Sequence, residues 1–219
     1  MELEIATVAS GWPDVVALFA GDLPVRIATR HGVSFDLPGL TVWLRNPADL
    51  TPPPGYPYPE LIKDYRDRLF GDQREASLLH QRLRRWAPSE GTPVDQFAQA
   101  VALPRQDEHS RSAVFSTWQP EEDLGGRFPV SPVGGALRIV ADELVLFLTA
   151  RSVDVWVGLV PELLTFAQLA SDAAPAATAR RWRSSPGPGP PGRWRRRSPG
   201  TSSGRPFPRR WSSSTGCVP

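Results

Sequence analysis

Alternation of apolar and polar residues along the chain indicates where its β-structure lies. Over 23–47 the apolar residues alternate with polar ones in two stretches, which predicts a strand, a turn near 31–32 and more strand. The segment 136–152 predicts two strands joined by a tight turn at 141–143. The apolar run within 112–118 is typical of a short buried strand.

Apolar residues at helical spacing predict three helical segments. The first is 12–20, with Pro13 in its first turn. The second runs over 61–86 and contains Gly71, where the helix is expected to break. The third is 161–174. Strands interspersed with helices in this way predict a domain of the α/β (α+β) class.

Charge divides the chain into two parts. All 23 acidic residues lie within 1–172 together with 15 of the 25 basic ones, so this part carries a net charge of −8. Residues 173–219 hold ten arginines and no acid, and consist mainly of Arg, Pro, Ser, Gly and Trp. Because such a composition cannot form a packed core, we expect a folded domain at 1–172 followed by a disordered tail at 173–219.

Two hypotheses explain this tail. Arginines interleaved with Trp182, Trp194 and Trp211 suit the binding of RNA or single-stranded DNA through phosphate contacts and base stacking. The alternative is a shifted reading frame near residue 173, since 24 of the 25 basic residues are arginine, as expected from a GC-rich gene. In that case the tail is not a selected sequence, and the domain at 1–172 is truncated.

The sequence carries no signal for export or membrane insertion. It has no run of 18 apolar residues, and its first ten residues, MELEIATVAS, lack the basic and apolar regions of a signal peptide. The single cysteine, Cys217, excludes an internal disulfide and a cysteine-rich zinc site. We therefore expect a cytoplasmic protein with no membrane segment and no metal site.

Arg151 and Ser152 stand side by side at the end of the last predicted strand. A guanidinium offers a planar fork of N–H donors and the neighbouring hydroxyl adds another, so the pair suits an anion such as a phosphate. The alternative is an ordinary solvated pair at the surface. The residues around the pair bear on this choice.

The segment 141–174 resembles the thymidylate synthase family. In that family a strand pair is followed by Arg-Ser-x-Asp and then by Gly-Leu-Pro-x-Asn at the start of a helix. Three earlier segments, 28–44, 65–70 and 109–124, resemble the family in the same order. The resemblance covers roughly residues 10–172 and implies a thymidylate-synthase-like mixed sheet packed with helices. The residues that match the last motif are Arg151, Ser152, Asp154, Gly158 and Leu159.

The resemblance implies a phosphate site for a pyrimidine deoxynucleoside monophosphate. By position, Arg30, Arg151 and Ser152 belong to this site, and Arg111 joins it from the partner subunit of a homodimer. The family has a second arginine beside the last one, whereas this chain has Ser112, so one donor is missing. The alternative for Arg30 and Arg111 is a surface arginine or a structural ion pair.

The nucleophile of the family is replaced in this chain. Family members attack the pyrimidine with a cysteine thiolate and take the one-carbon unit from methylenetetrahydrofolate. The expected cysteine position holds Ser131, and no activating base for its hydroxyl is evident. Two functions therefore stay open: a folate-dependent C5 methyl- or hydroxymethyltransferase of pyrimidine metabolism, or an inactive relative, a pseudoenzyme, that binds a nucleotide or regulates a partner.

The resemblance also implies that Tyr65, Asp154 and Glu162 contact the base or the folate. Glu162 stands where the family has an asparagine, and members that hydroxymethylate dCMP carry an acid there. A carboxylate only accepts hydrogen bonds, so it suits the 4-amino group of cytosine and repels O4 of uracil. We therefore expect a cytosine nucleotide to bind better than dUMP. The alternative is a Glu162 that interacts only with the helix dipole.

Overall fold

The structure of the chain is a computed structural model that describes residues 1–29, 32–72, 74, 77–87, 91–126 and 129–177. All of these residues belong to one compact unit, Met1–Ser184. Helices and small sheets follow one another along this unit, which confirms the α+β class. The predicted tail lies outside the described residues except for its first five positions, 173–177.

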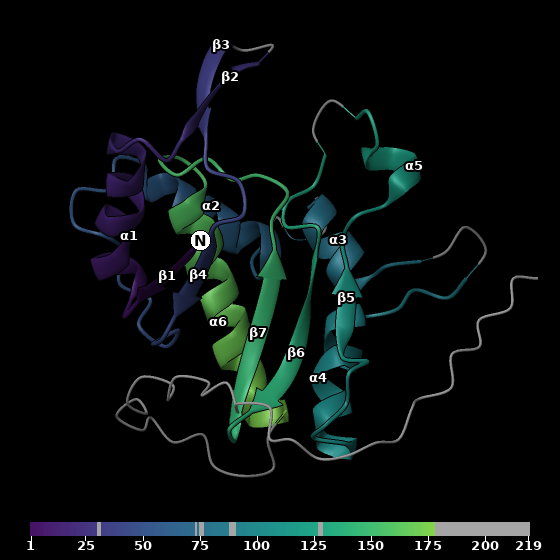
Figure 1. Cartoon of the computed structure of the whole chain (residues 1–219). Helices are drawn as coiled ribbons and strands as arrows, with labels where there is room; N and C mark the ends of the chain where they lie inside the picture. Colours follow the sequence, from purple (N-terminus) through teal and green to yellow (C-terminus); the bar gives the residue numbers. More distant parts are fainter. Residues whose placement is uncertain (30–31, 73, 75–76, 88–90, 127–128, 178–219) are drawn as a thin grey trace, which may run out of the picture. The chain divides into compact units, whose positions relative to one another are not determined.

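The largest sheet among the described residues is antiparallel, with the strand order β5-β6-β7 (Figure 1). Its strands are β5 (Val114–Ser116), β6 (Gly134–Val140) and β7 (Glu143–Thr149). The turn between β6 and β7 contains Ala141 and Asp142, whose φ angles are 51° and 64°. Positive φ at both central residues is the geometry of the tightest hairpin turns. The strand predictions for this part of the chain are therefore confirmed, except that only Phe115 of β5 is buried, whereas a buried strand was expected.

Two smaller sheets have two strands each. β1 (Glu2–Ile5) pairs in parallel with β4 (Thr41–Leu44). β2 (Val25–Thr29) and β3 (Gly32–Asp36) form an antiparallel hairpin, as the alternation in this region predicts. Both hairpin strands are exposed along their whole length. The turn residues 30–31 lie outside the described residues.

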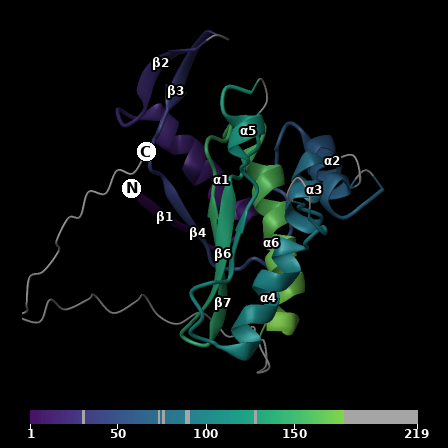
Figure 2. The same ribbon diagram turned by 90° about the vertical axis from the view of Figure 1, so that its right-hand side faces the viewer.

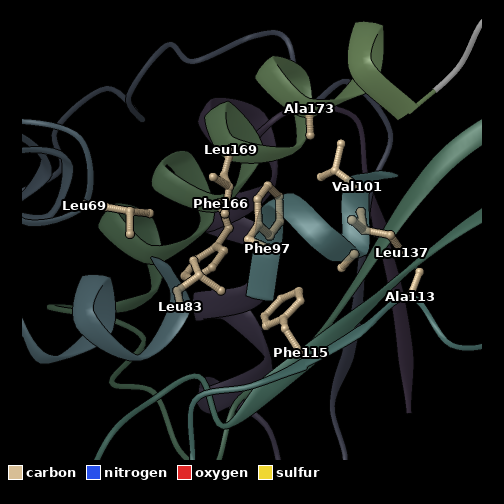
Figure 3. Packing of buried hydrophobic residues seen from close by; sticks show 11 residues of the cluster. Leu69, Leu83, Phe97, Val101, Ala113, Phe115, Leu137, Phe166, Leu169 and Ala173 are labelled. Atoms are coloured by element: carbon tan, nitrogen blue, oxygen red, sulfur yellow. The ribbon is translucent and has the colours of Figure 1, made fainter. Parts of the chain in front are cut away.

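Two helices cover one face of the β5-β6-β7 sheet (Figure 2). α4 (Gln96–Gln106), which is not among the predicted helices, packs against β5 and β6, and α6 (Leu159–Ala177) packs against α4 and β7. Phe97 of α4 meets the ring of Phe115 edge to face, with the ring centroids 5.7 Å apart. The buried residues of this core, shown in Figure 3, are Leu69, Leu83, Phe97, Ala100, Val101, Ala113, Phe115, Leu137, Phe166, Leu169 and Ala173.

A second apolar cluster joins the N-terminal part of the chain to the start of α6. It contains residues of α1 (Val8–Ala17) and of the first turns of α6. Two side chains hold the loop that precedes α6. The Trp12 Nε1–H donates to Val155 O (2.8 Å), and the Tyr56 hydroxyl donates to Val157 O (2.7 Å). This loop contains the end of the Arg-Ser-x-Asp segment, so the cluster fixes that segment against α1.

The predicted helical region 61–86 forms two helices, α2 (Pro59–Leu69) and α3 (Leu78–Arg84). The break lies close to Gly71, as predicted. A Cβ atom at Gly71 would approach the backbone of Asp67 within 2.8 Å. The chain therefore turns away from α2 at a position where a larger side chain would collide with the helix.

A buried arginine connects α3 to the short helix α5 (Pro120–Asp123). The Arg82 guanidinium donates to the Asp123 carboxylate, to Glu122 Oε2 (2.7 Å) and to Thr117 O (2.8 Å). Arg82 and Asp123 are each 3% exposed. Burial alone would raise the pKa of Asp123, but two backbone N–H groups and the guanidinium hold it below its usual value. The pair is therefore ionised and charge-balanced inside the protein.

The first helix starts earlier than predicted. α1 begins at Val8 because Thr7 and Ser10 form a reciprocal capping box at its N-terminus. Pro13 therefore lies inside the helix rather than in its first turn. A 3₁₀ turn, Leu18–Ala20, follows α1 directly.

The last helix is longer than the predicted 161–174. It continues to Ala177, and Ala173 and Ala174 are buried. The folded part of the chain therefore extends past the predicted boundary at residue 172. Within the described ranges, no helix has both the length and the apolar character needed to cross a membrane.

Candidate functional site

A cavity of about 340 Å³ lies between α2, α3, α6 and the loop before β6. Apolar residues form half of its lining: Leu69, Leu78, Leu79, Val130 and Phe166. Its polar lining residues are Tyr65, Arg68, Ser77, Ser131 and Thr165. Small-molecule sites run from about 300 to 1,000 Å³ and combine apolar walls with convergent polar groups, and this cavity has that volume with a lining that is half polar.

Tyr65 reaches the cavity because of its position on α2. It lies between the buried residues Ile62 and Leu69 on the face of α2 that packs against α6. Burial raises the pKa of Tyr65, and the nearby Glu162 charge raises it further. The phenol therefore keeps its proton at neutral pH and offers both a donor and an acceptor.

Glu162 lies near Tyr65 in the first turns of α6 and is 7% exposed. Its backbone N–H donates to Gly158 O (3.0 Å), whereas its carboxyl group makes no hydrogen bond or ion pair with any residue that the structure describes. Burial raises the pKa of Glu162 to about 7. Both the neutral and the ionised form are therefore populated near neutral pH.

Thr165 and Phe166 follow Glu162 by one helical turn and line the cavity. Positions three and four residues apart share one face of a helix, so all three side chains belong to the same side of α6. Thr165 is 1% exposed, and its Oγ1 has no hydrogen-bond partner among the described residues. This face of α6 therefore carries a carboxyl and a hydroxyl that pair with none of the described residues.

Ser131, which occupies the predicted nucleophile position, lies beside the Arg-Ser pair. Its hydroxyl donates to Ser152 O (3.1 Å). Its proton goes to a backbone carbonyl, so no residue within the described ranges acts as a base that would activate this hydroxyl as a nucleophile. This hydrogen bond joins the loop before β6 to the Arg-Ser-x-Asp segment, and the resemblance assigns both segments to one site.

The predicted phosphate ligands are only partly brought together. Arg151 and Ser152 are exposed, Ser152 contacts Ser131 through the hydrogen bond just described, and neither Arg151 nor Ser152 is among the residues that line the cavity. Arg111 is also exposed, but it precedes β5 whereas Arg151 follows β7. Since β5 and β7 run in the same direction on either side of β6, these two arginines lie at opposite ends of the sheet. Arg30 lies outside the described residues.

Asp154 shapes the loop before α6. Its Oδ1 accepts hydrogen bonds from the backbone N–H groups of Trp156 (2.8 Å) and Val157 (2.9 Å). Its backbone O accepts from the N–H groups of Gly158 and Leu159 (both 2.9 Å). This predicted site residue therefore holds the turn that starts α6.

Sequence reasoning missed three of the polar residues in the cavity. Arg68 pairs with Asp64 of the preceding turn (2.6 Å), and Ser77 caps α3 by accepting from the His80 N–H (3.3 Å). No feature of the sequence distinguishes Arg68 from an ordinary surface residue or Ser77 from an ordinary helix cap. Thr165 could have been found, because it lies three residues after Glu162 on a predicted helix.

The described residues contain no group of three or more His, Cys, Asp or Glu side chains that could hold a metal ion. The chain was also compared with models of known protein families, and none of them matches.

Proposed function

We propose that the chain is a thymidylate-synthase-like protein that binds a pyrimidine deoxynucleoside monophosphate in this cavity. The base lies between Tyr65 and α6, and the phosphate extends toward Arg151 and Ser152. The observation that carries the proposal is that Tyr65 and Ser131, which are far apart in the sequence, line one cavity, with Ser131 hydrogen-bonded to Ser152. Their convergence is what the family resemblance requires.

Glu162 would make the preference of the site for cytosine over uracil depend on pH. The ionised carboxylate only accepts, so it favours the 4-amino group of cytosine over O4 of uracil. The neutral acid also donates, so it serves either base. Because burial places the pKa of Glu162 at about 7, the preference for cytosine belongs to the pH range above neutrality.

Binding is proposed here without the one-carbon transfer. The residues present do not fit methylenetetrahydrofolate chemistry, because Ser131 replaces the thiol and donates its proton to a backbone carbonyl. A serine hydroxyl is far less ionised than a thiol near neutral pH. The proposal is therefore a nucleotide-binding relative, and a methyl- or hydroxymethyltransferase would need a nucleophile other than Ser131.

The proposal includes a homodimer. Arg111 lies too far along the sheet to serve the site of its own chain, so it would serve the site of a partner. The outer face of the β5-β6-β7 sheet supports this arrangement, because Val114, Val140 and Phe147 are 57%, 49% and 39% exposed. Apolar side chains exposed together on a sheet face are typical of surfaces that pack against another protein.

The phosphate part of the proposal is tested by calorimetric titration of the full chain with dCMP and with deoxycytidine. We expect dCMP to bind more tightly, because charge-assisted hydrogen bonds to Arg151 contribute about 1.5–3 kcal/mol. Arg151→Ala should remove most of this difference. The matched control is Arg105→Ala, an exposed arginine at the end of α4, which should retain it. Equal affinity for dCMP and deoxycytidine in the unaltered protein would refute the phosphate site.

A further inference from the structure

We infer that Thr165 is a specificity-determining residue of the cavity, whose hydroxyl hydrogen-bonds to ring position N3 of the pyrimidine beside the group that meets Glu162. The inference rests on the proposed function, since it assumes that a pyrimidine occupies this cavity. Thr165 lines the cavity, is 1% exposed, and has no hydrogen-bond partner for Oγ1 among the described residues.

An unpaired hydroxyl at this depth needs an explanation. A buried polar group that loses its hydrogen bond to water costs stability unless it finds a new partner. Threonines inside helices usually satisfy the hydroxyl by donating to the carbonyl four residues earlier. In this chain that carbonyl belongs to Pro161, and Oγ1 does not bond to it. Oγ1 has less than 1 Å² of exposed surface and no partner among the described residues, so a ligand would reach the hydroxyl when the χ1 rotamer turns it toward the cavity that Thr165 lines.

The position of Thr165 on α6 indicates which part of a ligand it meets. It lies one helical turn from Glu162, with Phe166 beside it and Tyr65 of α2 lining the same cavity. A threonine in a helix populates two χ1 rotamers, which exchange the positions of the hydroxyl and the methyl group. Because Glu162 and Thr165 lie one turn apart on α6, a flat ring held between α2 and α6 would present two adjacent polar atoms to them.

Glu162 and Thr165 match two adjacent positions on the edge of a pyrimidine ring, position 4 and N3. In cytosine the exocyclic 4-amino group donates and the neighbouring N3 accepts. An ionised Glu162 accepts from the amino group, and the Thr165 hydroxyl donates to N3. In uracil N3 carries a proton, and the hydroxyl can accept from it. The Thr165 hydroxyl therefore requires a ring atom at position 3 that can form a hydrogen bond. Glu162 distinguishes the 4-amino group of cytosine from O4 of uracil.

The test is a calorimetric titration of the full chain with dCMP and its 3-deaza analogue, in which a C–H replaces N3. The variants are Thr165→Val, which has the same shape without the hydroxyl, and Thr165→Ser, which keeps the hydroxyl. We expect the unaltered protein and Thr165→Ser to bind dCMP about 5- to 20-fold more tightly than the analogue. Thr165→Val should bind both ligands equally and should unfold at the same or a higher temperature.

The outcomes separate this inference from the proposed function. If the unaltered protein binds dCMP and Thr165→Val keeps the full preference over the analogue, Thr165 has no role in recognition, although the nucleotide site stands. If the unaltered protein binds no pyrimidine nucleotide, the proposed function fails and the inference fails with it. Should Thr165→Val not fold, the same comparison is made with Thr165→Ala, which also lacks the hydroxyl.

Discussion

At the scale of single residues, the buried carboxyl of Glu162 links the cavity to pH. The pKa of Glu162 rises from 4.5 to about 7 because burial disfavours the charged form. Below about pH 4.5 the group is protonated in both the folded and the unfolded chain, so its burial does not lower the free energy of unfolding. As the pH rises to about 7, only the unfolded chain ionises, and the folded protein loses stability. The full penalty above pH 7 is about 3 kcal/mol.

Glu162→Gln should remove this penalty, because glutamine has nearly the same shape and no charge to bury. We expect the variant to be little more stable than the unaltered protein at pH 5 and clearly more stable at pH 8. Urea unfolding at both values measures the difference. An equal difference at pH 5 and pH 8 would mean that the Glu162 carboxyl is ionised in the folded protein at both values.

At the scale of elements, the ion pair between α3 and α5 should contribute strongly to the free energy of unfolding. Arg82→Met leaves the buried Asp123 carboxylate without its cation, which typically costs about 3–5 kcal/mol. The control is Arg84→Met on the same helix, whose partner Asp95 is 3.3 Å away and partly exposed. Breaking that pair should cost less than about 1 kcal/mol. Similar losses in both variants, measured by urea unfolding, would contradict a special role for Arg82.

The centre of the β5-β6-β7 sheet depends on a glycine. A Cβ atom at Gly135 of β6 would lie 2.4 Å from Phe147 O and 2.6 Å from the ring of Phe115. Gly135→Ala should therefore destabilise the protein by about 1–3 kcal/mol through overpacking. The control Gly21→Ala, whose nearest neighbour would be 3.8 Å away, should change stability little. Thermal unfolding of both variants tests this, and an unaffected Gly135→Ala would show that the sheet relaxes freely.

The elements that the sequence predicted are those with a regular pattern. The β6-β7 hairpin was identifiable because two apolar segments flank a short polar turn, and α6 because its apolar residues recur at helical spacing. α4 was missed although Phe97, Ala100, Val101 and Pro104 are buried at helical spacing, since a proline inside a segment argues against a helix. The early start of α1 was missed because Gly11 and Pro13 resemble helix breakers, whereas the capping box before them determines the start.

The candidate site was harder to predict than the elements. Its lining comes from four segments, and no periodicity in the sequence shows which helix faces meet. The resemblance identified Tyr65, Ser131 and Glu162, which lie at or beside the cavity. It could not show that the Glu162 carboxyl has no partner in the part of the chain that the structure describes, or that its pKa is raised, because burial depends on the packing of α2 against α6.

At the scale of the whole molecule, the proposed homodimer should depend on the outer face of the β5-β6-β7 sheet. Val114→Lys places a charge on that face at a position that is 57% exposed in one chain. It should convert a dimer to a monomer with little effect on the fold. Leu124→Lys, at a position that is 78% exposed after α5, is the control and should leave the dimer intact. Analytical ultracentrifugation distinguishes these results, and a dimer that survives Val114→Lys would exclude this face.

The central claim is that a pyrimidine nucleotide binds beside Glu162, and one titration tests it most directly. The full chain and Glu162→Gln are titrated with dCMP and dUMP at pH 6 and pH 8. We expect dCMP to bind, and its preference over dUMP to increase several-fold from pH 6 to pH 8, because Glu162 loses its donor proton across this range. Glu162→Gln should show no such increase. Absence of nucleotide binding at both pH values would contradict this claim. So would a preference for dCMP over dUMP that does not change with pH in the unaltered protein.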